Sequence, residues 1–198
     1  MEEFLAGHRY YDRELATPAA KILPGEYFVA GDEMALVTVL GSFVAACVRD
    51  TTLGVGGMNH FMLPDGGQEV NGVVAPSARY GTYAMEMLLN HLGKLGGRRS
   101  RLEAKVFGGG NVMPGMTATR VGDRNAEFVL AFMQREGIRV VAQDLKGDYP
   151  RKICYFPRSG RVLMRQLRAT GRDAVSRYEE AYRKRLAATR VEGDVELF

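Results

Sequence analysis

The chain has 198 residues, 46% of them apolar, with 27 Lys and Arg residues against 23 Asp and Glu. This length and composition predict one domain with a full hydrophobic core and exclude a largely disordered chain. No run of about 18 apolar residues occurs, so we expect no membrane span, and the acidic start is unlike a secretory signal peptide. Two cysteines make no disulfide framework, so we expect a cytoplasmic protein.

The beginning of the chain reads as a polar lead-in that is followed by a buried strand. Residues 1–35 are polar and punctuated by proline and glycine, with a short edge strand expected at 25–29. Nearly every residue of 35–40 is apolar, which predicts a strand with both faces buried.

The next segment leads to a histidine. For 43–48 the pattern leaves two alternatives open, a short helix capped by Ser42 or a second buried strand. A strand at 55–63 then carries His60, and the turn signal at 64–67 closes it.

The second half alternates helices and strands. A helix is predicted from Ser77, as its N-cap, to Leu95, closed by two glycines, and a second amphipathic helix at 123–136. A half-buried strand at 102–106 precedes a glycine-rich loop at 108–111. Further strands are expected at 138–142, 153–156 and 162–167, and a terminal helix at 172–188.

These elements predict an α+β fold. Several strands with two helices between them are typical of mixed domains. Glycine makes up 24 of 198 residues, well above the usual ~7%, which favours short β elements with tight turns. We expect one domain at 1–168, with its core at about 25–168, followed by a C-terminal helix and tail at 169–198.

The C-terminal end is basic. From Arg151 onward there are 12 Lys and Arg residues against six Asp and Glu, which suits an acidic partner, nucleic acid or a membrane surface. No aromatic residues alternate with the basic ones, as a stacking platform for nucleic acid requires. We interpret the stretch as a solvated helix and expect no nucleic-acid partner.

Three histidines and two cysteines are the candidates for chemistry. His60 alone sits at a glycine-rich strand entry, where an imidazole could serve as general base and acid, or be only a hydrogen-bonded structural residue. We interpret His91 as a core histidine and His8 as a surface one. Cys47 and Cys154 are interpreted as buried structural cysteines. Their spacing fits no zinc site, so we expect no metal and no cofactor.

The triple glycine at 108–110 follows a predicted strand, as a phosphate-binding loop would. It lacks the Gly-Lys-Ser/Thr ending of such a loop and the three spaced glycines of the dinucleotide fingerprint. We therefore expect it to serve loop geometry or close backbone packing.

Six sequence motifs occur in order along the chain. The first three are Leu-Gly-Ser-x-Val-Ala-x-Cys-x-Arg-Asp, Gly-Gly-Met-Asn-His-Phe-Met-Leu-Pro and Ala-Arg-Tyr-Gly-x-Tyr-Ala-Met-Glu. The others are Leu-Glu-Ala-Lys-Val-Phe-Gly-Gly-Gly-Asn at 102–111, Gly-Asp-Arg-Asn-x-Glu-Phe at 122–128 and Asp-Leu-x-Gly-Asp-Tyr-Pro-Arg-Lys at 144–152. Together they resemble the CheD family of bacterial chemotaxis over roughly residues 25–168.

The resemblance implies a cytoplasmic enzyme that hydrolyses glutamine side chains of methyl-accepting chemoreceptors to glutamate. In that family a cysteine attacks the amide, a histidine activates the thiol and protonates the departing ammonia, and a threonine orients the histidine. The implied fold is a β-sandwich-like core with flanking helices, similar to toxin-type cysteine deamidases. Some members of the family bind CheC, a phosphatase of the chemotaxis response regulator.

Carried over residue by residue, the resemblance is incomplete. His60 matches the family histidine, and Thr38 is the nearest candidate for the orienting threonine, although the strict spacing falls on Val37. The family nucleophile directly follows Gly-Ser, 17 residues before the histidine, and here that position is Phe43. Cys47 matches a second, non-nucleophilic cysteine of many relatives.

Phenylalanine has no nucleophilic atom, so we expect little or no deamidase activity from this chain. A single substitution, a natural non-catalytic copy, and rescue by Cys47 remain open as explanations, with the first two favoured. The alternative function is a non-catalytic binding module that docks chemoreceptors or a CheC-like phosphatase.

Overall fold

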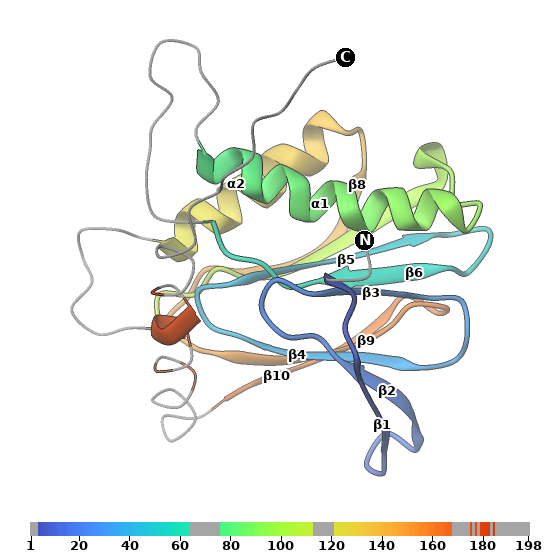
Figure 1. Cartoon of the computed structure of the whole chain (residues 1–198), viewed down its shortest axis with the longest axis horizontal. Coiled ribbons are helices and arrows are strands. Elements are labelled where there is room, and N and C mark those ends of the chain that lie inside the picture. The colour runs from blue at the N-terminus through green and yellow to red at the C-terminus, as the bar shows by residue number, and fades with distance from the viewer. Residues whose placement is uncertain are drawn as a thin grey trace.

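Two five-stranded sheets pack face to face, and two α-helices cover the outer face of one of them (Figure 1). The structure is a computed structural model. It describes residues 4–63, 76–112, 121–167, 175, 177, 179–182 and 184. The predicted α+β fold, with mixed sheets flanked by helices, is confirmed.

The sheet farther from the helices, called the outer sheet, has the strand order β1-β2-β4-β9-β10. Its strands are β1 (His8–Asp12), β2 (Thr17–Lys21), β4 (Ala35–Leu40), β9 (Arg151–Phe156) and β10 (Arg161–Gln166). Only β2 and β4 pair in parallel, and the remaining neighbours are antiparallel. The sheet is therefore mixed, and β4 lies at its centre.

The other sheet, called the central sheet, lies between the outer sheet and the helices and has the order β3-β6-β5-β7-β8. Its strands are β3 (Tyr27–Ala30), β6 (Gly56–Asn59), β5 (Val44–Asp50), β7 (Leu102–Gly108) and β8 (Arg139–Leu145). Only β7 and β8 pair in parallel. The expected short edge strand is confirmed as β3, at the edge of this sheet.

Helix α1 (Pro76–Lys94) and helix α2 (Val121–Arg135) pack on the central sheet, and the 3-10 helix η2 (Arg99–Arg101) leads into β7. Helix α1 begins one residue before Ser77 and ends at the predicted glycines. The N–H of Gly97 donates to the carbonyl of Leu92, and Gly96 has φ +90°, a geometry typical of a helix C-cap. In the described part of the chain, no helix is both long and apolar enough to cross a membrane.

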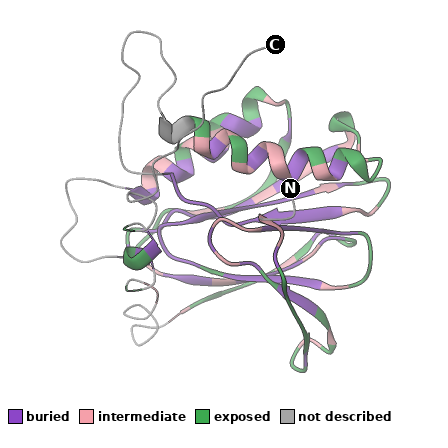
Figure 2. Cartoon of the chain, viewed as in Figure 1, coloured by how far each residue is buried: buried purple, intermediate pink, exposed green. Residues whose placement is uncertain are grey.

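Strand β5 resolves the alternative that the sequence left open, because 44–50 is a strand buried on both faces (Figure 2). Val44, Ala46 and Val48 point into the core beneath the helices, whereas Ala45 and Cys47 point into the core between the sheets. Successive strand residues face opposite sides, so a strand covered on both sides is apolar throughout. Apolar composition alone therefore could not distinguish this strand from a buried helix.

The polar lead-in contains two strands that the sequence prediction missed. In β1, residues 8–11 are exposed, so the strand carries no apolar alternation that would identify it. Strand β2 begins Thr17-Pro18, and proline is depleted in strands. Strand β1 is the edge strand of the outer sheet, where a polar sequence is tolerated, and β2 is its inner neighbour, paired with β1 and β4. The predicted turn at 64–67 and part of the terminal helix at 172–188 lie outside the described residues.

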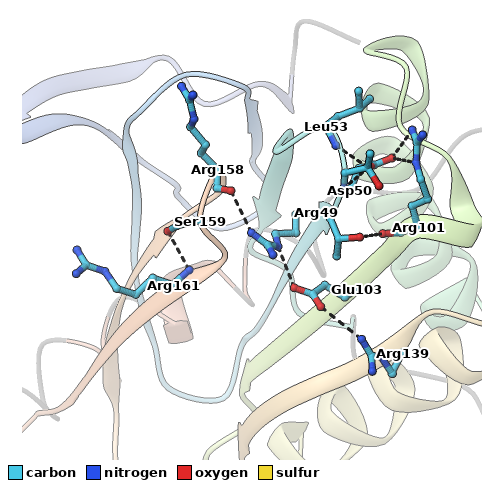
Figure 3. Close-up of polar contacts among 11 residues, drawn as sticks. Arg49, Asp50, Leu53, Arg101, Glu103, Arg139, Arg158, Ser159 and Arg161 are labelled. Atoms are coloured by element: carbon cyan, nitrogen blue, oxygen red, sulfur yellow. Dashed lines mark hydrogen bonds and ion pairs between the residues drawn. The ribbon is translucent and has the colours of Figure 1, made fainter.

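At the end of β5, the fully buried carboxylate of Asp50 organises a polar cluster (Figure 3). One oxygen accepts the N–H groups of Thr52 and Leu53 at 2.9 and 3.0 Å. The other accepts the N–H of Arg98 at 3.0 Å and pairs with the Arg101 guanidinium at 2.8 Å. Burial alone would raise the pKa of Asp50, but these hydrogen bonds outweigh burial and lower the pKa to about 2.

Arg49, next to Asp50, ties the two sheets together (Figure 3). Its guanidinium donates to Glu103 on β7 at 2.9 Å and to the carbonyl of Arg158, in the turn between β9 and β10, at 3.0 Å. The second oxygen of Glu103 lies 3.7 Å from Arg139 on β8. The C-terminal end of β5 therefore links the central sheet to the β9–β10 turn of the outer sheet.

We predict that Asp50→Asn lowers the free energy of unfolding by about 3 kcal/mol, since it removes a buried charge that accepts three backbone N–H groups and pairs with the partly buried Arg101. Because the folded state lowers the pKa of Asp50, its contribution is present above the unfolded pKa near 3.8 and is lost toward pH 2. Urea unfolding near neutral pH measures the loss, with exposed Asp32→Asn as the matched control. Equal stabilities of the two variants would contradict the prediction.

Candidate active site

The candidate site lies where the chain crosses from the outer sheet to the central sheet. The crossing loop is 41–43, between β4 and β5. It brings Phe43 beside His60, which directly follows β6 and contacts Thr38 of β4. All three side chains are buried and line one cavity of about 630 Å³.

His60 lies just beyond the strand that was predicted to contain it. Pairing with β3 ends at Asn59. The N–H of His60 donates to the carbonyl of Glu26 at 3.0 Å, and the His60 carbonyl accepts the N–H of Gly25 at 2.7 Å. The observed strand β6 is thus shorter than the predicted strand at 55–63. Its end places His60 next to the loop that precedes β3.

Thr38 fixes the orientation of the His60 ring. The threonine hydroxyl donates its single proton to the carbonyl of Ile22 at 2.8 Å. The same hydroxyl oxygen lies 2.8 Å from Nδ1 of His60, so it accepts the Nδ1 proton. The other ring nitrogen, Nε2, is buried and has no hydrogen-bond partner among the described residues. The imidazole therefore presents the Nε2 lone pair, the arrangement that a general base requires.

The structure places Thr38, and not Val37, against the His60 imidazole. Neighbouring strand residues point to opposite faces. Leu36 and Leu40 belong to the core between the sheets, and Thr38 shares their face of β4. Val37 packs on the opposite face, in the cluster that contains Cys154. Only Thr38 can contact the imidazole.

Burial dominates the protonation of His60. Removal from water lowers its pKa, and the interaction with the Ile22 carbonyl offsets only part of this effect, so the pKa is about 4. The ring is therefore neutral near pH 7 and can accept a proton.

This pKa makes folding stability sensitive to acid. Below the ordinary pKa of 6.5, the unfolded chain binds a proton at His60 that the folded chain does not bind until about pH 4. We predict that acidification from about pH 7 to about pH 4 destabilises the parent by on the order of 3 kcal/mol more than His60→Gln. Urea unfolding of both proteins across this range tests it. Parallel stability curves would contradict it.

The crossing loop is held from one side by hydrogen bonds to its three carbonyls. The Gly41 and Phe43 carbonyls accept the N–H groups of Gly110 and Gly109, each at 2.7 Å. The Ser42 carbonyl accepts the side-chain N–H of Asn125, on α2, at 2.7 Å. In a trans peptide the C=O and the following N–H point in opposite directions. Anchoring the carbonyls therefore turns the loop N–H groups toward the other side.

The triple-glycine loop thus packs closely against the backbone of the crossing loop. The sequence analysis predicted such close backbone packing. Gly108 has φ +108°, and a Cβ there would lie 2.1 Å from the Phe43 carbonyl oxygen. Only glycine permits this approach. Asn125 was part of a quoted motif, but the sequence did not indicate its contact with Ser42.

The loop N–H groups converge on the carboxylate of Glu179, a residue that sequence reasoning did not single out. One carboxylate oxygen accepts from Gly41 at 3.0 Å, Ser42 at 2.9 Å and Phe43 at 3.4 Å. The other accepts the Ser42 hydroxyl at 2.6 Å and its N–H at 3.0 Å. Burial raises the pKa of Glu179, and these hydrogen bonds lower it by less, so the net shift is upward.

Comparisons with known proteins place the chain in a family. The family model described as CheD chemotactic sensory transduction matches residues 62–166. Relatives from Dechloromonas aromatica and Janthinobacterium sp. (strain Marseille) are 58% and 55% identical. Each match covers 100% of this chain and 97% of the relative. A relative from Methylobacillus flagellatus is 53% identical, over 100% of this chain and 98% of the relative.

The chain belongs to the CheD family. The Janthinobacterium and Methylobacillus relatives carry the name "Probable chemoreceptor glutamine deamidase CheD", and the Dechloromonas relative carries the same name with the number 1. The range matched by the family model begins two residues after His60. The full-length relatives extend the match across Thr38, the crossing loop and His60.

Phe43 occupies the position at which the resemblance to the CheD family places the nucleophile. Its ring is fully buried and packs edge-on against His60, with 4.8 Å between the ring centroids. The ring therefore fills the space in front of the imidazole with carbon atoms. It supplies neither a proton to the histidine nor an attacking atom.

Cys47 lies in the core and is not among the residues that line the cavity beside His60. It lies on β5 with 1% of its surface exposed, in the core between the sheets. Burial raises the pKa of its thiol strongly, with only a small opposing effect from Lys105, so it stays protonated near neutral pH. Cys154 is also buried and free, and burial raises its pKa as well. Both positions agree with a structural role.

The remaining histidines lie away from the site. His91 is half-buried on α1, and its ring packs edge-on against Tyr27 at 5.7 Å. His8 is exposed on β1. Among the residues that the structure describes, no group of three His, Cys, Asp or Glu side chains could hold a metal ion.

Proposed function

We propose that this chain is a chemoreceptor glutamine deamidase by descent, in which Phe43 replaces the attacking cysteine. It binds chemoreceptor segments that carry a target glutamine and releases little or no ammonia from them. The reaction is that named for its relatives, conversion of a glutamine side chain to glutamate. The observation that carries the proposal is the Phe43 ring packed 4.8 Å from a His60 ring that Thr38 holds in the general-base tautomer.

Three further features support a deamidase site at this position. Nε2 of His60 faces no hydrogen-bond partner in the described residues, as expected for a base whose partner would be a substrate or a thiol. The crossing loop gathers backbone N–H groups beside residue 43, where an amide oxygen would gain negative charge during attack. The adjacent cavity, of about 630 Å³, has room for a side chain from a partner.

A second function, that of a non-catalytic binding module, is favoured by the burial of Phe43. An aromatic ring with no exposed surface, set between His60 and Tyr182, is a well-packed residue and leaves the surrounding fold intact. Such a module would dock chemoreceptors or a CheC-like phosphatase without chemistry. Two buried free cysteines support the cytoplasmic location that either function requires.

The proposal is tested with a purified cytoplasmic fragment of a chemoreceptor. We expect the unmodified chain to bind the fragment and to release no measurable ammonia. We expect Cys47→Ser to leave both the binding and the absence of ammonia release unchanged. Ammonia release that disappears in Cys47→Ser would make Cys47 the nucleophile and overturn the assignment of position 43. Absence of binding by both the unmodified chain and Phe43→Cys would overturn the receptor function.

A further inference from the structure

The described helical residues of the C-terminal segment, 175, 177, 179–182 and 184, contact the candidate active site through one face. Residues 175, 179 and 182 are helical and separated by four and three positions, so they lie on the same side. Val175 and Glu179 line the cavity that also contains His60. The Tyr182 ring packs on Phe43, with 5.3 Å between centroids, and its hydroxyl lies 3.1 Å from that of Tyr80.

Within this face, Glu179 is placed on the reacting centre itself. Its side chain is 3% exposed, although it comes from a segment more than 130 positions away from the crossing loop. A Cβ added to Gly41 would lie 2.6 Å from a Glu179 oxygen, so the loop approaches the carboxylate as closely as glycine permits. The crossing loop therefore forms a site whose backbone N–H groups and Ser42 hydroxyl bind a planar carboxylate.

The chemistry of this group matches the proposed reaction. Deamidation turns a glutamine amide into a glutamate carboxylate, and Glu179 is a glutamate whose carboxylate touches the N–H of residue 43. The oxygen that accepts from the three backbone N–H groups sits where a substrate carbonyl oxygen would be polarised. The second oxygen lies 2.6 Å from the Ser42 hydroxyl, to which an amide nitrogen at this place could donate. The Ser42 N–H, now shared between both oxygens at 2.9 and 3.0 Å, would then bond to the first oxygen alone.

We propose that Glu179 is an internal mimic of the reaction product, and that its helix occupies the surface on which a glutamine-bearing helix of a substrate docks. The assignment of the reaction rests on the proposed function. The crossing loop then binds the side-chain oxygen of the substrate, and the C-terminal segment must leave before a receptor segment can enter. When this segment occupies the site, substrate cannot bind. The apparent Kd for substrate is therefore the intrinsic Kd divided by the fraction of molecules in which the site is open.

The decisive experiment makes position 179 a substrate. In the double variant Phe43→Cys with Glu179→Gln, the new thiol attacks the side-chain carbonyl carbon of the new glutamine. The C–N bond breaks, ammonia leaves with the thiol proton passed through His60, and water cleaves the thioester to restore glutamate. Mass spectrometry of the tryptic peptide that follows Arg177 detects the replacement of the amide by a carboxyl group.

We expect this conversion to be complete and its rate to be independent of protein concentration, since the reaction occurs within one molecule. The matched control is Phe43→Cys with Glu180→Gln, because Glu180 is the exposed neighbour of Glu179 and pairs with Lys184. Its new glutamine is expected to remain unconverted. Equal conversion at the two positions would overturn the proposal.

The outcome separates this inference from the receptor function. If Phe43→Cys releases ammonia from a receptor fragment while the glutamine at 179 persists, Glu179 is no product mimic. If that glutamine is converted while the receptor fragment is not, the receptor function fails and the mimic stands. Conversion of both the glutamine at 179 and the receptor fragment supports both the product mimic and the receptor function.

A second measurement needs no catalysis and covers the case in which neither glutamine reacts. Hydrogen exchange of the Ser42 and Phe43 amides is compared in the parent, Glu179→Ala and Glu180→Ala. We expect the amides to exchange at least tenfold faster in Glu179→Ala than in the parent, and no change in Glu180→Ala. Unchanged protection in Glu179→Ala would show that the carboxylate does not hold the loop, and would overturn the proposal.

Discussion

Phe43→Cys is expected to raise the rate of ammonia release from a chemoreceptor fragment by about 10³-fold or more over the unmodified chain. The substitution adds the one chemical group that the site lacks. The new sulfur would stand beside the His60 imidazole, which packs edge-on against the Phe43 ring and is neutral near pH 7. Nε2 of this imidazole has no hydrogen-bond partner among the described residues. The neighbouring loop N–H groups would stabilise the oxyanion of the attacked amide.

The same substitution removes a fully buried ring, so the gain in activity should come with a loss of stability. Replacing a buried phenylalanine with a small residue typically costs about 3 to 5 kcal/mol. The cavity already adjoins Phe43, and water can enter the space that the ring leaves. Thermal unfolding measures this loss, and assays should be run well below the lowered midpoint.

Phe43→Ala is the matched control for this experiment. It opens the same space without adding a thiol, and we expect it to release no ammonia. Activity in Phe43→Ala would mean that relief of steric blockage, with another nucleophile, is sufficient. An inactive Phe43→Cys that is folded and binds the receptor fragment would favour the binding module over the impaired enzyme.

The elements predicted well from sequence are those whose pattern has one physical explanation. Strand β4 matches the apolar run at 35–40, and β7 shows the expected alternation of buried and partly buried residues. Helix α2 buries Ala126, Val129 and Met133 on one face, as their spacing predicts. In each case the local period and the tertiary environment agree.

The parts that sequence could not predict depend on partners distant in the chain. Strand β5 is apolar because a sheet covers one face and helices the other, which only the fold reveals. The choice of Thr38 over Val37 required knowledge of which face of β4 meets His60. Glu179 reads as one charge in a basic helix, and only the folded chain places it on the crossing loop.

In the Phe43→Cys background, His60→Asn is expected to lower the rate of ammonia release by about 10²- to 10⁴-fold, the usual contribution of a general acid–base. Asparagine keeps polar atoms in the buried position, but it cannot take a proton from the thiol or return one to ammonia. Single-turnover measurements across pH check this. A rate in His60→Asn equal to that of Phe43→Cys alone would contradict a catalytic role for His60.

Thr38 should act through His60 and not on the substrate. In the same background we expect Thr38→Val to lower kcat by about tenfold or more with little change in KM, since the valine methyl group cannot accept the Nδ1 proton and the ring loses its fixed tautomer. Thr38→Ser keeps the hydroxyl, with its bonds to Ile22 and His60, and should restore most of kcat. A purely structural threonine would instead lose kcat in proportion to the loss of folded protein, and Thr38→Val would then leave the pH profile of the remaining activity unchanged.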